Sequence, residues 1–275
     1  MQLISFSIPK SLEKLVVCPL GDIQWSGEAG STAQDQLKRH IDYCLELGAY
    51  FVGTGDYIDF LSPSNRKRLM RADLYDTSKD AISQKSRELV EEVFDKFLKP
   101  TVGRWMGIVE GHHFYQIENE TTDEWLAEKL KCQFLGTSAF IRVPSADWVI
   151  YVHHGTGGGK LPGSTLNRIY HLAAGLQGAE VYVLGHDTKL GASHLSRPFI
   201  KWGKRNSEHE LESRDVFLVS SGGFSRSNIV GHRIGGVIRG DYAERGLMTP
   251  SPLSAPIITV NLRSKTKEHR TWVSI

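Results

Sequence analysis

Several histidines of this chain occur where a chemical role is the best explanation for them. Two adjacent pairs, His112-His113 and His153-His154, follow apolar runs, and His186 follows another apolar run and a glycine. A histidine buried in a hydrophobic core is usually single, so these pairs need a chemical reason. Imidazole binds transition metals as a neutral ligand and transfers protons near neutral pH. These segments could hold a metal ion, donate a proton, or do both.

Two carboxylates occupy similar positions, each directly after an apolar run and a glycine. Asp22 is followed by Gln24, and Asp56 is followed by Asp59. In an extended segment, residues two apart point the same way, so Asp22 and Gln24 could offer two oxygens to one ion. An aspartate that caps a helix or a turn is the alternative for Asp22, and also for Asp59. Carboxylates on neighbouring strands repel each other unless a cation lies between them, which predicts a metal.

The periodicity of apolar residues predicts an α/β chain in which every one of these side chains follows a strand. The predicted strands are 15–20, 50–54, 105–109, 140–143, 148–152, 181–184, 216–219, 256–262 and 271–274. The predicted helices are 31–47, most of 63–100, 124–131 and 166–176. In open α/β sheets, the loops at the carboxyl ends of strands form the functional site. We therefore expect the candidate residues to lie together at the carboxyl ends of the strands.

Length and composition favour one globular domain over residues 1–275. The chain has 40% hydrophobic and 23% charged residues, without an internal repeat or a low-complexity linker. This composition excludes disordered, collagen-like and coiled-coil proteins. The net charge of +2 argues against a protein held on nucleic acid by charge alone, but it does not exclude an enzyme that visits nucleic acid briefly.

No apolar stretch approaches the roughly 20 residues that cross a bilayer, and the first residues lack the features of a signal peptide. We therefore expect a cytoplasmic protein without a membrane partner; the oligomeric state is not predicted. Three cysteines, Cys18, Cys44 and Cys132, are widely spaced and form no CxxC pair. This pattern favours buried reduced thiols over a disulfide or a zinc knuckle.

In combination, these segments resemble the calcineurin-like metallophosphoesterases. The order here is Asp-x-Gln, Gly-Asp-x-x-Asp, Gly-His-His, His-Gly and Gly-His over residues 16–190. The family pattern is Asp-x-His, Gly-Asp-x-x-Asp, Gly-Asn-His-Asp/Glu, His and Gly-His-x-His. The resemblance implies a four-layer α/β/β/α sandwich with two central mixed β-sheets.

The later part of the chain is similar to the phage- and prophage-encoded branch of this family. In that branch, a strand leads into a His-Gly-x-Gly-Gly-Gly loop, and Ser-Gly-Gly-Phe, Tyr-Ala-Glu and Pro-Ser-Pro follow nearer the C-terminus. The same segments occur here at 154–159, 221–224, 242–244 and 250–252.

The resemblance implies two divalent metal ions of manganese, iron, zinc or magnesium. Asp22 and Gln24 would hold the first ion, and Asp56 would bridge both. The second ion would also be held by His112, His154 and His186. His153 stays open as the ligand in place of His154, because the sequence does not show which member of the pair turns inward.

The chain departs from the family pattern mainly at the first ion. Gln24 replaces a histidine, and Thr188 stands where the last histidine of the pattern is expected. Neutral oxygen donors bind transition metals less well than imidazole, so this site is weakened or suited to a harder ion such as magnesium or manganese. His112 replaces the family's asparagine and adds an imidazole at the second ion. Phe114 replaces the usual acid after the catalytic histidine.

The activity that the resemblance implies is hydrolysis of a phosphate ester. A metal-bridged hydroxide would attack phosphorus, and His113, oriented by Asp59, would protonate the leaving alkoxide. A phosphodiesterase or nuclease is the leading hypothesis. The alternatives are a phosphomonoesterase or protein phosphatase of the same fold, and a catalytically degenerate scaffold that binds a partner. Gln24 and Thr188 favour the scaffold.

Basic and aromatic residues bear on the substrate. The basic residues form two patches: Arg66, Lys67, Arg68 and Arg71, and then Lys201, Lys204 and Arg205. Four aromatic residues lie near the candidate site: Trp25, Tyr57, Phe114 and Tyr115. Positive charge with stacking surfaces suits a nucleotide, DNA or RNA phosphodiester. A solvated helix face and ordinary packing explain the same residues equally well.

Overall fold

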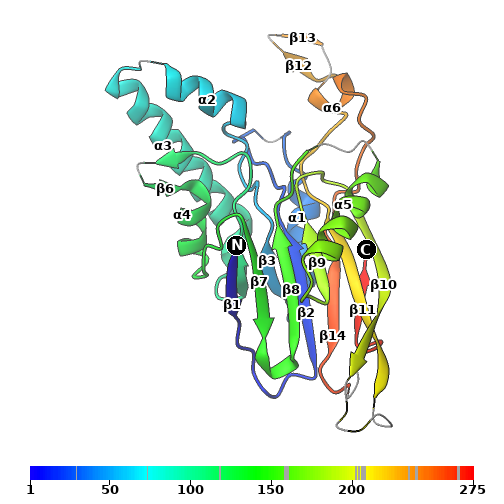
Figure 1. The fold of residues 1–275 in the computed structure, drawn as a ribbon. Helices are drawn as coiled ribbons and strands as arrows, with labels where there is room; N and C mark the ends of the chain where they lie inside the picture. The colour runs from blue at the N-terminus through cyan, green and yellow to red at the C-terminus, as the bar shows by residue number, and fades with distance from the viewer. Residues whose placement is uncertain are drawn as a thin grey trace.

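In the computed structural model, two mixed β-sheets pack face to face, with helices on the outer side of each (Figure 1). The structure describes residues 1–28, 30–72, 74–117, 119–157, 161–201, 203, 205, 209–234, 236–238, 241–264 and 267–275. The described residues contain six α-helices, sheets of six and five strands, and two small hairpins. The predicted α/β class and its four-layer α/β/β/α arrangement are confirmed.

The five-stranded sheet supplies three of the predicted site-bearing strands. Its members are β2 (Lys14–Leu20), β3 (Tyr50–Gly53), β4 (Trp105–Ile108), β14 (Ile257–Asn261) and β15 (Thr271–Ser274). The strand order is β15-β14-β2-β3-β4, and β2, β3 and β4 are parallel to one another. The carboxyl ends of these three strands therefore lie side by side.

The six-stranded sheet supplies the other two site-bearing strands, β8 and β9. Its members are β1 (Gln2–Ser5), β7 (Ser138–Val143), β8 (Trp148–His153), β9 (Val181–Leu184), β10 (Leu190–Lys201) and β11 (Glu210–Ser221). The order is β1-β7-β8-β9-β11-β10, and β8 and β9 are parallel. Sequence analysis missed β1 and β10, which form the two edges. Many side chains of β1 and β10 are exposed, so these strands lack the continuous apolar run of a strand that is buried on both faces.

The helices form the two outer layers. The five-stranded sheet is covered by α1 (Gln34–Glu46), α3 (Asp76–Val93) and α4 (Thr122–Lys129), and the six-stranded sheet by α5 (Pro162–Gly175). The remaining helices are α2 (Pro63–Arg71) and the short α6 (Tyr242–Arg245), and the hairpins are β5–β6 (Gln116–Ile117, Glu120–Thr121) and β12–β13 (Arg233–Ile234, Val237–Ile238). Among the described residues, no helix combines the length and apolar character needed to cross a membrane.

Three hydrophobic cores fill the spaces between the four layers. Adjacent residues of one strand enter different cores, because side chains alternate across a sheet. Val17 lies between the sheets while Cys18 faces the helices, and Val183 lies between the sheets while Tyr182 faces α5. Burial on both faces explains why these strands are continuous apolar runs in the sequence.

Candidate metal centre

Four side chains from four strand ends meet where the two sheets approach each other. Asp56 follows β3, His112 follows β4, His154 follows β8, and His186 follows β9. One ligand atom of each lies within 4.8 Å of the ligand atoms of the other three. Asp56 and His154 are each only 2% exposed. This group, called the four-residue centre below, could hold a metal ion.

The contact between His154 and Asp56 shows why a cation fits this centre. Nδ1 of His154 lies 2.6 Å from the backbone oxygen of Thr54 and donates a hydrogen bond to it, because a carbonyl only accepts. Nε2 then faces Oδ2 of Asp56 at 3.2 Å, and both atoms are buried without a hydrogen-bond partner. These two atoms need a proton or a metal ion between them. A second hydrogen bond that orients a ligating imidazole is typical of metal sites.

His112 and His186 complete the centre with neutral imidazoles. Their Nδ1 atoms are 3.0 Å apart. Burial and the nearby positive charge of His154 lower the pKa of both rings, that of His186 to about 4. Both rings are therefore uncharged at neutral pH, as metal ligation requires.

The surroundings of Asp56 hold it in its ionised form. Its Oδ1 accepts the N–H groups of His112 and His113, the latter at 2.9 Å. Burial alone would raise the pKa of this carboxyl, but the positive charge of the nearby His154, together with the charge and backbone N–H of His113, holds that pKa below its usual range. The carboxylate therefore contributes a full negative charge to the centre.

Asp22 lies beside the centre, on the loop that follows β2. It is fully buried, and its Oδ2 accepts the backbone N–H of His186 at 3.0 Å. Its Oδ1 is buried without a hydrogen-bond partner. Burial raises the pKa of Asp22 to about 7. The positive charge of His154 lowers this pKa, and the negative charge of Asp56 raises it. A second cation near Oδ1 would relieve this cost, because it would favour the charged carboxylate.

The loops that carry the site are held in a left-handed backbone conformation. The residues with positive φ include Asp22 (48°), Gln24 (51°), Asp56 (56°), His186 (72°) and Thr188 (52°). The segment of Asp22 and Gln24 is thus not extended, so the predicted alternation of their side chains does not hold. Hydrogen bonds between loops replace the strand ladder here, for example from the Gln24 N–H to the Asp56 carbonyl at 3.0 Å. Such conformations cost about 1–3 kcal/mol each and cluster at functional sites.

Close packing between these loops depends on glycine. Gly55 has φ +88°, and a Cβ on it would lie 2.5 Å from Cα of Gly111. A Cβ on Gly111 would overlap the backbone nitrogen and Oδ1 of Asp56. The Gly-Asp and Gly-His-His motifs therefore let the ends of β3 and β4 touch.

Gln24 and Thr188, the two departures from the family pattern, lie in the same loops but outside the four-residue centre. The Gln24 side chain is half-buried. Oγ1 of Thr188 lies 3.4 Å from Oγ of Ser251. The role of Gln24 as a ligand of a first ion stays a prediction.

His113 turns away from its neighbour His112 and pairs with Asp59. Its Nδ1 is 2.7 Å from Oδ1 of Asp59, and its Nε2 is 4.0 Å from Oδ2 of Asp56. Burial would lower the pKa of His113, but the hydrogen bond that its ring donates to Asp59 and the charge of Asp56 outweigh burial and raise the pKa. His113 thus lies at the edge of the centre, outside the group that could hold a metal ion.

The other histidine pair divides in the same way. His154 enters the four-residue centre, whereas His153 stays outside it, and its Nδ1 accepts the N–H of Gly155 at 2.7 Å. This arrangement answers the question that the sequence left open.

Two residues that sequence analysis did not place at the site hold the loop of His112 and His113. Asp123, at the start of α4, is 2% exposed, and its Oδ2 accepts the Gly111 N–H at 2.8 Å. Arg66 of α2 donates to the backbone oxygens of His112 and Phe114, the latter at 2.8 Å, and its guanidinium lies 3.8 Å from the Phe114 ring centroid. The capping box of α4 marks the start of that helix in the sequence. The contacts of Asp123 with Gly111 and of Arg66 with the His112 loop leave no comparable signal in the sequence.

The predicted basic and aromatic surface is correspondingly smaller. Arg66 is engaged with the loop, whereas Lys67, Arg68 and Arg71 are exposed on α2. Trp25 and Tyr57 are each 1% exposed and belong to the core beneath the helices, so their prediction as stacking surfaces is wrong. The Trp25 ring packs edge-on against Phe97, and the Tyr57 ring packs edge-on against Trp105 of β4.

The Ser-Gly-Gly-Phe segment after β11 supports Asp22. The N–H groups of Phe224 and Ser225 donate to the Asp22 carbonyl at 2.9 and 3.1 Å. A Cβ on Gly223 would lie 2.7 Å from Cβ of Asp22. Of the other sequence features, Gly158, Gly159 and Lys204 lie outside the described residues.

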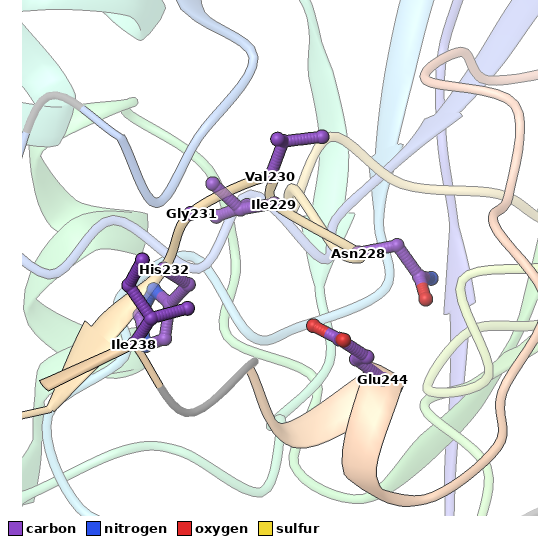
Figure 2. Close-up of a pocket in the computed structure, with 7 residues that line it drawn as sticks. All are labelled: Asn228, Ile229, Val230, Gly231, His232, Ile238 and Glu244. Atoms are coloured by element: carbon purple, nitrogen blue, oxygen red, sulfur yellow. The ribbon is translucent and has the colours of Figure 1, made fainter.

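A separate pocket of about 400 Å³ is formed by the segment after Ser225, the β12–β13 hairpin and α6 (Figure 2). Its lining residues are Asn228, Ile229, Val230, Gly231, His232, Ile238 and Glu244. Val230 is fully exposed, so the hollow is open to solvent. The lining includes no residue of the four-residue centre.

Metal binding at the four-residue centre is expected to release protons. The charge of Asp56 and its contact with His154 outweigh burial and raise the pKa of His154 to about 9. Without an ion, His154 is therefore protonated at neutral pH, and a metal must displace this proton. The apparent affinity should then rise with pH up to about 9. Calorimetric titration at pH 7 in buffers of different ionisation enthalpy should show about one proton released per ion. Enthalpies independent of the buffer would contradict this.

No protein-family model matches the chain, and no curated protein is significantly similar to it. The case for a function therefore rests on the geometry of the site.

Proposed function

We propose that this protein is a metal-dependent phosphodiesterase of the calcineurin-like metallophosphoesterase kind. The observation that supports this best is the buried contact between Oδ2 of Asp56 and Nε2 of His154, which needs a shared proton or cation, inside a group with two neutral imidazoles. A centre of one carboxylate and three imidazoles suits zinc, iron or manganese. Its position at the ends of parallel strands is typical of α/β enzymes.

Two ions fit the site better than one. The four-residue centre would hold one ion, and Asp22, with its unpartnered Oδ1, would hold the other together with Asp56. Gln24 and Thr188 would add neutral oxygens there, which favour magnesium or manganese. When bound, such ions lower the pKa of water and neutralise charge that develops on a phosphate.

The chain's own residues supply the acid. His113 would protonate the leaving oxygen from Nε2, while Asp59 accepts a hydrogen bond from the Nδ1–H group and so fixes the tautomer. Asp123 and Arg66 would keep the loop in place through the Gly111 N–H and the carbonyl oxygens of His112 and Phe114.

The proposed substrate is a nucleotide or nucleic-acid phosphodiester. Lys67, Arg68 and Arg71 are exposed on α2, the helix whose Arg66 contacts the site loop. These charges would attract a phosphate backbone toward the site. A binding protein without catalysis is the second candidate, and the loss of two imidazoles at Gln24 and Thr188 is the observation that favours it.

Metal content and hydrolysis together test these proposals. The protein would be stripped with chelator, reloaded with manganese, zinc, iron or magnesium, and assayed on bis-p-nitrophenyl phosphate and p-nitrophenyl phosphate. Two ions per chain with cleavage of the diester is the expected result. Cleavage of the monoester alone would favour a phosphomonoesterase, and at most one ion with no turnover in any metal would favour the binding protein.

A further inference from the structure

A second cluster of metal-binding side chains lies in the core between β2 and α1, apart from the four-residue centre. Cys18 is on β2, and His40 and Cys44 are one turn apart on α1. Nε2 of His40 lies 3.4 Å from Sγ of Cys18 and 3.5 Å from Sγ of Cys44. The three ligand atoms all lie within 4.8 Å of one another. Residues that are far apart in the sequence thus present two sulfurs and one imidazole to a common point.

The distances match those around a tetrahedral zinc ion. Zinc binds thiolate sulfur at about 2.3 Å and imidazole nitrogen at about 2.0–2.1 Å, so a tetrahedral angle places N and S about 3.5 Å apart. A single S–H···N hydrogen bond would account for one of the two contacts. Nε2 offers only one hydrogen-bonding position, so it cannot serve both sulfurs equally well. Without an ion, the two thiols hydrogen-bond to each other and one of them to Nε2, whereas a shared cation places both sulfurs at these distances from Nε2.

The surroundings also suit a bound metal. Both cysteines are buried, while His40 is half-buried and gives solvent a route to the cluster. His40 shares its helix face with apolar residues of the core, where a polar ring needs a partner. Two thiolates and an imidazole form a soft ligand set that favours zinc over magnesium or calcium.

We propose that Cys18, His40 and Cys44 bind one zinc ion that fastens α1 to β2. The three side chains fill three tetrahedral positions and leave the fourth to water. The site is structural, and it supports the loop that follows β2. Asp22 lies on that loop, four residues beyond Cys18. Phe224 links the cluster to it, because its ring lies 5.5 Å from the His40 ring and its N–H donates to the Asp22 carbonyl. This proposal does not depend on phosphodiesterase activity.

Cobalt(II) substitution of the full-length protein tests the site, because thiolate-to-cobalt charge transfer absorbs in the near ultraviolet and ligation by Asp and His does not. The wild-type protein should show this band, and Cys44→Ala should lose it. Cys132→Ala is the matched control, since Cys132 is the third cysteine and lies outside the cluster, and it should keep the band. Asp56→Asn should also keep it, which separates this site from the four-residue centre.

Three results would overturn the proposal: no band in the wild-type protein, a band that survives in Cys44→Ala, or two oxidised thiols without bound metal. If Cys44→Ala does not fold, His40→Ala decides, because its side chain is only half-buried. Loss of this ligand should weaken zinc binding by at least about tenfold, since even outer-shell changes cost about 10–100-fold. Unchanged zinc affinity in a folded His40→Ala protein would contradict the site.

Discussion

Replacing Asp56 with asparagine is expected to remove the ion of the four-residue centre and to lower diester hydrolysis by at least about a thousandfold. The carboxylate is held ionised mainly by the charge of His154, accepts two backbone N–H groups, and faces Nε2 of His154. An amide keeps the shape of the side chain but supplies no negative charge to balance a cation. Metal analysis after dialysis and steady-state rates in manganese measure the two effects.

Asp123→Asn is the matched control for this change. Asp123 is as buried as Asp56 and holds the same loop through the Gly111 N–H, but it lies outside the four-residue centre. Its pKa is raised by burial to about 7, and an asparagine oxygen can still accept the Gly111 hydrogen bond. It should keep its metal and lose little activity. Equal metal loss in both variants would mean that Asp56 acts on loop structure and not as a ligand.

The strands that carry the site were predictable because they are buried on both faces. Val17 and Cys18 enter different cores, as do Tyr182 and Val183, so each strand appears as an uninterrupted apolar run. Periodicity alone indicated only an α/β fold, and the four-layer arrangement came from the family resemblance. Strands β1 and β10 were missed because many of their side chains are exposed, so neither appears as an uninterrupted apolar run.

The convergence of the site was predictable from strand ends, but its local geometry was not. The left-handed conformation of Asp22 and Gln24 arises from hydrogen bonds to loops that are distant in the sequence. Arg66 was expected on a basic surface, and its contacts with the His112 loop depend on where α2 lies. In the same way, Cys18 and Cys44 come together only because α1 packs on β2.

Replacing His113 with alanine is expected to lower hydrolysis of a dinucleotide by about 10²–10⁴-fold while metal content stays unchanged. His113 lies outside the four-residue centre, and its Nδ1 is held by Asp59 at 2.7 Å. An alkoxide leaving group needs a proton, whereas p-nitrophenolate leaves without one. The same substitution should therefore cost much less with bis-p-nitrophenyl phosphate. Rates on both substrates, with metal analysis of the same samples, measure this contrast.

The pH dependence separates proton donation from positioning. The hydrogen bond that His113 donates to Asp59 and the charge of Asp56 raise the pKa of His113. The ring therefore stays protonated to higher pH, and its contribution is lost as pH rises through that pKa. The advantage of wild type over His113→Ala should shrink at alkaline pH, and Asp59→Asn should move this decline to lower pH. An equal loss on both leaving groups at every pH would assign His113 a positioning role, and loss of metal would make it a ligand.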